Sequence, residues 1–354
     1  MNRRNFIELG AGTALATQAA GTEFPGNRWS AKGLKLGVSH QRPEMLTDDH
    51  LKYLKQMGVE YLEVRIPSAL SSVEYLSGIK RKLEDRGLKL FEVMLADKYS
   101  SPEFCLGLPG RDREIAFFQN FLRDLGKAGI DATTYAWNTG GNFYATGRGT
   151  TRECETRHFD LSQVTASEPE RSEEQMWANY EYFIKRVLPV AEDAGVRLQL
   201  HPNDPPVDYS GVARIFKSRK AFRRAMEISN YSPYSGLLFC VGSWAEMPGP
   251  DGKGEDIIGA IEEFGSRGLI FQIHYRNVTA PLPVFDETFP DNGYINMYKV
   301  VRTLARLNYN GMLVPDHVPR CGADAIGNRA GEAFIFGYIR AMIQAAETEL
   351  CRVS

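Results

Sequence analysis

The sequence predicts a (β/α)8 barrel, an α/β fold, from three observations. Apolar strand signals alternate with amphipathic helix signals eight times along the chain. No linker-like stretch divides residues 29–354, so we expect a single domain there. The last four predicted strands each end on a residue type that can ligate a metal ion, and in a barrel the carboxyl ends of the strands form one face. A doubly wound open sheet is the alternative, but it offers no reason for that arrangement.

The eight predicted strands are apolar runs that stop at glycine, proline or polar residues. They span 34–40, 61–66, 88–95, 130–138, 196–201, 237–240, 269–274 and 312–316. The predicted helices carry apolar stripes of helical period, with Thr47 or Asp48 capping the first and Gly87 ending the second. They span 47–57, 71–86, 112–128, 174–194, 212–226, 256–264, 296–307 and 329–350. Because each helix follows a strand, the pattern favours a parallel sheet.

A long stretch between about 139 and 173 interrupts this alternation. It is rich in glycine and arginine and has no clear period, so we interpret it as a loop. So long a connection inside a domain is usually a functional lid or a binding loop. Arg148 and Arg152 in this loop are candidates for reaching over an anionic substrate, and a solvated surface position is the alternative.

The composition excludes several classes of function. The chain has 354 residues, 43% of them hydrophobic and 24% charged, with a net charge of −2, which is typical of a globular protein. It has no basic excess that would suggest nucleic-acid binding, and no apolar run of about 18 residues that would suggest a membrane span. A small molecule is therefore the expected partner.

Residues 1–28 predict a twin-arginine-type export signal and a linker. Arg3 and Arg4 are followed by Phe6 and a mild Gly/Ala/Thr-rich segment, so a charged start precedes an apolar middle and a small-residue exit. We expect a periplasmic protein that passes through the twin-arginine export machinery, which carries folded proteins. The alternative is a disordered tail with chance arginines on a cytoplasmic protein.

The five cysteines are too few and too scattered for a disulfide scaffold; they are residues 105, 154, 240, 321 and 351. Four strand ends supply the candidate metal ligands His201, Cys240, His274 and Asp316. Taken singly, a histidine there is more often a hydrogen-bonded structural residue, a cysteine core packing, and an aspartate a loop cap. Together, two imidazoles, a thiolate and a carboxylate suit a borderline divalent ion such as Mn²⁺, Fe²⁺, Co²⁺ or Zn²⁺.

Four motifs at these residues resemble those of the D-mannonate dehydratase family, and the resemblance is strong from about 196 to 317. They are His-Pro-Asn-Asp-Pro-Pro at 201–206, Cys-Val-Gly-Ser at 240–243, His-Tyr-Arg-Asn-Val at 274–278 and Pro-Asp-His at 315–317. The resemblance implies a metal-dependent, xylose-isomerase-like barrel and a lyase of uronate catabolism that converts D-mannonate to 2-keto-3-deoxy-D-gluconate and water. It also implies that His201, Cys240, His274 and Asp316 bind one divalent ion, with Mn²⁺ or Fe²⁺ expected ahead of other metals. Arg276 and His317 would lie beside the substrate.

The chain departs from the family pattern at three places. Asn296 stands where the family has aspartate, Val318 stands where it has glycine, and the segment 320–328 lacks a tyrosine that the family uses. Two other functions therefore stay open alongside the dehydratase. One is a metal-dependent isomerase or epimerase acting on a neutral sugar, and the other is an exported sugar-binding protein without turnover.

Dehydration of a sugar acid removes a proton next to the carboxylate and expels a β-hydroxyl, and a divalent ion must stabilise the enediolate. Arg276 is expected to hold the carboxylate with its planar fork. His317 is expected to shuttle the proton, or alternatively to orient a ligand. The residues expected to bind the rest of the substrate are Asn138, Asn203, Asp204, Asn277 and Arg148. A homodimer is a further candidate assembly.

Overall fold

The computed structural model describes residues 33–138, 144–165, 170–322 and 328–353, and the predicted export signal at 1–28 lies outside them. Eight parallel strands form the nearly closed barrel that the sequence predicts, in the order β3-β2-β1-β12-β9-β8-β7-β4. They are β1 (Lys35–Gln41), β2 (Tyr61–Ile66), β3 (Lys89–Leu95), β4 (Ala132–Ala136), β7 (Arg197–His201), β8 (Ser235–Cys240), β9 (Ile270–His274) and β12 (Met312–Val314). The last strand is shorter than predicted because Pro315 has no N–H to donate to a ladder, so Asp316 lies in the loop after it.

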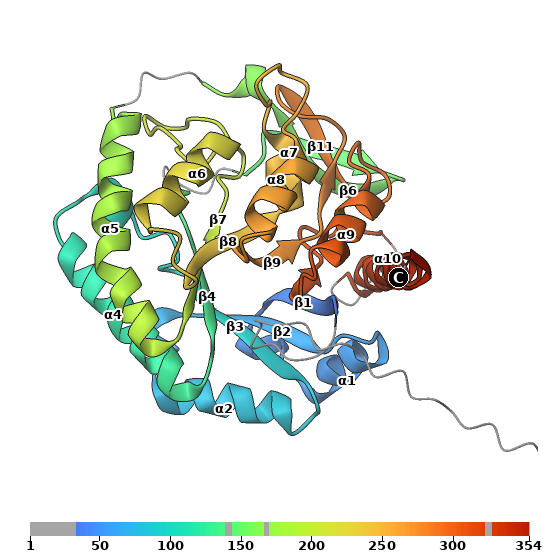
Figure 1. Ribbon diagram of the computed structural model, residues 1–354, viewed down its shortest axis with the longest axis horizontal. Coiled ribbons are helices and arrows are strands. Elements are labelled where there is room, and N and C mark those ends of the chain that lie inside the picture. The colour runs from blue at the N-terminus through green and yellow to red at the C-terminus, as the bar shows by residue number, and fades with distance from the viewer. Residues whose placement is uncertain (1–32, 139–143, 166–169, 323–327, 354) are drawn as a thin grey trace, which may run out of the picture.

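Within the part of the chain that the structure describes, eight main helices surround these strands (Figure 1). They are α1 (Asp48–Gln56), α2 (Val73–Glu84), α4 (Arg111–Ala128), α5 (Glu173–Ala194), α6 (Arg219–Ile228), α8 (Ile257–Gly265), α9 (Met297–Arg306) and α10 (Arg329–Val353). Two short helices, α3 (Pro102–Leu106) and α7 (Val241–Glu246), lie in the loops. The apolar stripe predicted for α4 is buried. Among the helices that the structure describes, none combines the length and apolar character needed to cross a membrane.

The helix expected at 212–226 begins later than predicted. Helix α6 starts at Arg219, after Ser218, whose hydroxyl accepts a hydrogen bond from the Ala221 amide. The preceding segment is extended because side chains take up its backbone N–H groups. Asp208 Oδ1 accepts from the Arg214 amide at 2.9 Å, and Asn203 Oδ1 accepts from Phe216 at 2.7 Å. These bonds compete with helix formation.

The stretch interpreted as an irregular loop at 139–173 contains a β-hairpin. Strands β5 (Gly147–Thr151) and β6 (Cys154–Asp160) are joined by Arg152 and Glu153, whose φ angles of 50° and 64° suit a two-residue hairpin turn. Strand β6 also pairs with β11 (Val284–Thr288), which pairs with β10 (Asn277–Val278) in a second, antiparallel sheet. Strand β10 follows directly after β9, so this sheet lies at the carboxyl end of the barrel. Arginine and glutamate are unusual turn residues, so no turn signal marks the hairpin in the sequence.

Candidate metal centre and active site

Three predicted ligands end three adjacent strands. His201 ends β7, Cys240 ends β8 and His274 ends β9, and Cys240 is the register partner of His274. One ligand atom of each lies within 4.8 Å of the others. Parallel strands place residues at matching levels side by side, so this convergence follows from the barrel.

Asp316 joins the same cluster from the loop after β12. Its Oδ2 lies 3.4 Å from Nδ1 of His274 and 3.6 Å from the sulfur of Cys240. Its Oδ1 accepts a hydrogen bond of 2.8 Å from Nε2 of His40, at the carboxyl end of β1. His40, His274 and Asp316 thus form a second group of candidate ligands that shares His274 with the first. The structure brings all four predicted ligands together.

The donor set fits a divalent metal ion. Within the described residues, neither ring nitrogen of His274 forms a hydrogen bond, although the side chain is buried. A buried nitrogen without a partner is costly, and a metal bond would satisfy it. Nδ1 of His201 lies 2.7 Å from the Pro202 carbonyl, so it donates there and leaves Nε2 for a metal. Burial disfavours the thiolate of Cys240, but the charge of Arg276, with His201 and His274 close by, outweighs it and lowers the pKa of Cys240 to about 5.

Arg276 organises this cluster. Its side chain is 0% exposed, and its nitrogens are already engaged by the protein. They lie near Asp204 (2.9 Å), Glu246 (2.9 Å), Ser243 (2.8 Å), Cys240 (3.6 Å), Asp316 (3.4 Å) and His317 (2.9 Å), and they contact Glu287. This differs from the expected contact with a substrate carboxylate, because the planar fork of Arg276 has no side open to a ligand. Arg276 instead holds a thiolate and several carboxylates in place.

His317 lies at the edge of the cluster with 19% of its side chain exposed. Its Nδ1 is 2.7 Å from Oε1 of Glu287, on β11, which fixes the ring. Donation from Nδ1 to this carboxylate leaves Nε2 as a proton acceptor, and Nε2 is 3.6 Å from Oδ1 of Asp316. The backbone of His317 has φ 47°, a left-handed conformation that non-glycine residues adopt at a cost and that is common at functional sites. The position suits proton transfer.

Two arginines that sequence reasoning missed border the cluster. Arg65, on β2, is 28% exposed and places Nη2 at 3.4 Å from Nε2 of His40. Arg157, on β6, is 36% exposed and places Nη1 at 3.1 Å from Nδ1 of His317. His40 ends the first predicted strand, so the strand-end argument could have found it. Arg157 lies in the hairpin, for which the sequence offered no period.

The five expected substrate-binding residues differ in burial: three are buried, Asn138 is half-buried and Arg148 is exposed. Asn203 and Asn277 are 0% exposed, and their amides bond the backbone of surrounding loops. They organise loops, which differs from the expected substrate contact. Asp204 is buried, and its Oδ2 pairs with Nη2 of Arg276. Asn138 is half-buried next to Asn203, whose Nδ2 donates to its Oδ1 at 2.9 Å.

The two loop arginines lie further from the metal cluster. Arg148 is 68% exposed on β5, one strand beyond Arg157, and pairs with Glu155. Arg152, in the hairpin turn, pairs with Asp291, and its guanidinium lies 5.5 Å from the ring of Phe289. Both thus have protein partners near the surface.

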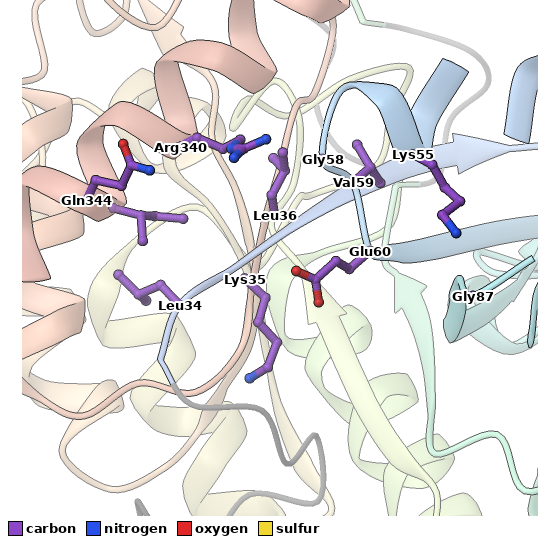
Figure 2. A pocket seen from close by; sticks show the side chains of 11 residues that line it. Leu34, Lys35, Leu36, Lys55, Gly58, Val59, Glu60, Gly87, Arg340 and Gln344 are labelled. Atoms are coloured by element: carbon purple, nitrogen blue, oxygen red, sulfur yellow. The ribbon is translucent and has the colours of Figure 1, made fainter. Parts of the chain in front are cut away.

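Figure 2 shows a different hollow, at the opposite end of the barrel. It is lined by the start of β1, the turn before β2 and the last helix, including Lys35, Glu60 and Arg340. Burial and the charge of Lys89 lower the pKa of Lys35 to about 8. Lys35 begins β1, whereas His40 lies near its carboxyl end, so this hollow is separated from the metal cluster by about 15 Å of strand.

Known proteins resemble this chain over more than half of its length. The family model of D-mannonate dehydratase matches residues 152–347, more than half of the chain. A mannonate dehydratase of Streptococcus equi subsp. zooepidemicus is 30% identical over 285 residues, covering 71% of this chain and 76% of that protein. One of Oceanobacillus iheyensis is 28% identical over 277 residues, covering 68% and 76%.

Solved structures agree with the fold. The crystal structure of mannonate dehydratase from Streptococcus suis serotype 2 matches with a TM-score of 0.78 and 26% identity, covering 90% of this chain and 95% of that one. A D-psicose 3-epimerase from Clostridium cellulolyticum H10 matches with a TM-score of 0.57 and 16% identity, covering 87% and 99%. The second likeness concerns the fold alone.

Proposed function

The chain belongs to the D-mannonate dehydratase family of sugar-acid hydro-lyases, and from this membership we propose that it converts D-mannonate, or a closely related aldonate, to 2-keto-3-deoxy-D-gluconate and water. The observation that carries the proposal is the convergence of His201, Cys240, His274 and Asp316 at the carboxyl end of the barrel. A charged thiolate and carboxylate there favour a cation, and Mn²⁺ or Fe²⁺ is the proposed ion.

In the proposed reaction, these four residues would hold a divalent ion, which would stabilise the negative charge that develops when the α-proton leaves. His317 takes that proton at Nε2, while Glu287 accepts from Nδ1 and keeps the ring in place. The electron pair left on the α-carbon forms the double bond as the β-hydroxyl departs, and this hydroxyl takes up a proton and leaves as water. Arg65 and Arg157 are partly exposed and border the cluster, so they hold the carboxylate of the substrate. Asn138 is the proposed contact to a hydroxyl.

Arg276 has a positioning role in this scheme. It neutralises the acids around it and keeps Cys240 in the thiolate form. Burial and the nearby charge of Asp204 hold the pKa of the Glu246 carboxyl well above its usual range, which favours its neutral form. The balance of charge around the metal cluster depends on this arginine.

The substrate class is tested with the purified protein loaded with Mn²⁺ or Fe²⁺ and a panel of aldonates and neutral sugars. We expect formation of a 2-keto-3-deoxy acid from D-mannonate or an epimer, and no conversion of neutral sugars. The control is the same panel after the ion has been removed with a chelator. Conversion of neutral sugars alone would replace the dehydratase proposal with an isomerase.

We also propose that the protein is exported to the periplasm by the twin-arginine route, which is supported by Arg3, Arg4 and Phe6 at the start of the sequence. Changing both arginines to lysine should retain the protein in the cytoplasm with its amino terminus uncleaved, because this route reads the arginine pair. Cell fractionation and amino-terminal sequencing measure both effects. Normal export of the double variant would contradict the proposal.

A further inference from the structure

Two cysteines from distant segments of the chain lie in contact beside the active site. The sulfur atoms of Cys154 and Cys321 are 3.1 Å apart, although 167 residues separate them in sequence. Cys154 begins β6, directly after the hairpin turn, and Cys321 lies four residues beyond His317. Both side chains are half-buried, so a small oxidant can reach them.

The backbone holds these cysteines opposite each other. Glu155 and Arg320 form an antiparallel bridge in which each amide donates to the other's carbonyl, at 3.1 and 2.8 Å. Cys154 precedes Glu155 and Cys321 follows Arg320, so the two cysteines form the next pair in the same register. A pair next to a doubly hydrogen-bonded one is the closely spaced type, with Cα atoms about 4.5 Å apart. Disulfides span Cα distances of roughly 4.4–6.8 Å, so bridging needs no backbone rearrangement.

We propose that Cys154 and Cys321 are a site of disulfide formation that ties the hairpin to the loop carrying Asp316 and His317. The oxidant is a small disulfide such as glutathione disulfide. One protein thiolate attacks it and releases one glutathione thiolate, and the second protein thiolate then attacks the mixed disulfide and releases the other. The two cysteines lose two electrons and two protons, and the glutathione disulfide gains two electrons and two protons to become two thiols.

The link would act on the active site through two segments. Strand β6 carries Arg157, and the loop before Cys321 carries Asp316 and His317. Arg157 already contacts His317 at 3.1 Å, so a bond between Cys154 and Cys321 fixes both sides of that contact. An exported protein meets oxidising conditions in which such a bond persists, whereas a cytoplasmic one keeps the thiols reduced.

The test uses the reduced, full-length protein in native buffer with glutathione disulfide. Thiols are then counted after denaturation with a chelator, and peptides are mapped without reductant. We expect two of the five thiols to be lost, a peptide that joins Cys154 to Cys321, and an apparent Tm raised by roughly 3–7 °C that dithiothreitol reverses. C351S, which removes the exposed thiol, is the matched control and should still lose two thiols.

The variants C154S and C321S should each keep all four remaining thiols and show no oxidant-dependent rise in Tm. Their melting in reductant checks that they are folded. Retention of all five thiols by the native wild type would overturn the proposal. A linked peptide that involves another cysteine, or glutathione that stays attached to Cys154 or Cys321, would overturn it equally.

Discussion

His274→Ala should yield a folded protein that has lost both its divalent ion and its activity. His274 belongs to both groups of candidate ligands, and its ring nitrogens form no hydrogen bond within the described residues. A four-ligand zinc site contributes about 10–16 kcal/mol of binding, or roughly 3 kcal/mol per ligand if shared equally. We therefore expect metal affinity to fall by about 100-fold or more, with turnover reduced to background because the ion is essential. Elemental analysis and the dehydratase assay measure the two losses.

His158→Ala is the matched control for this prediction. His158 lies on β6, outside the cluster, and bonds to Asp286 at 2.7 Å. The same substitution there should leave the metal content unchanged. Circular dichroism and melting confirm that both variants are folded, which we expect because the apolar core lies outside the cluster. Stoichiometric metal in His274→Ala would show that the assigned ligands are wrong.

The strand ends explain why the metal cluster could be predicted from the sequence. In a parallel barrel the last residues of the strands lie at the same end. The predicted strand ends alone therefore bring His201, Cys240 and His274 to that end. Asp316 converged as well, although the strand stops earlier at Val314. His40 obeys the same rule and was overlooked.

The surroundings of the cluster depend on contacts that no local pattern encodes. Arg276 follows a predicted strand directly, which suggested a group open to substrate, but side chains from other segments close around it. Glu287 and Arg157 reach the site through a second sheet built from segments about 130 residues apart. A one-dimensional period shows which face of an element is buried, but it does not show which charges meet there.

A polar layer beneath the cluster is a second feature of this kind. Gln199 donates to Glu92 at 2.9 Å and Gln272 donates to Glu63 at 3.3 Å, all inside the barrel. Burial, with the charge of Glu63, raises the pKa of Glu92 to about 8, so one of the two acids is neutral at pH 7. In sequence these residues are single polar positions within apolar strands. Only the folded structure shows that these residues pair across the barrel.

The arginine that binds the substrate carboxylate can be identified with matched variants. Arg157→Gln removes a partly exposed charge that contacts His317 but none of the four proposed ligands. Hydrogen bonds to charged groups contribute about 1.5–3 kcal/mol, so kcat/KM for the aldonate should fall by about 10- to 150-fold with metal content unchanged. Arg148→Gln makes the same change one strand further out and should have little effect.

Arg276→Lys should behave differently from Arg157→Gln, and the contrast separates positioning from substrate binding. Lysine keeps the charge but cannot contact Asp204, Glu287 and the sulfur of Cys240 at once, because it lacks the planar fork. The pKa of Cys240 should then rise, and metal affinity should fall together with turnover. Metal titration followed by steady-state kinetics at saturating metal distinguishes the two variants. If Arg276→Lys retained full metal affinity while kcat/KM alone fell, Arg276 would be the group that holds the carboxylate, and Arg157 would be left with a supporting role.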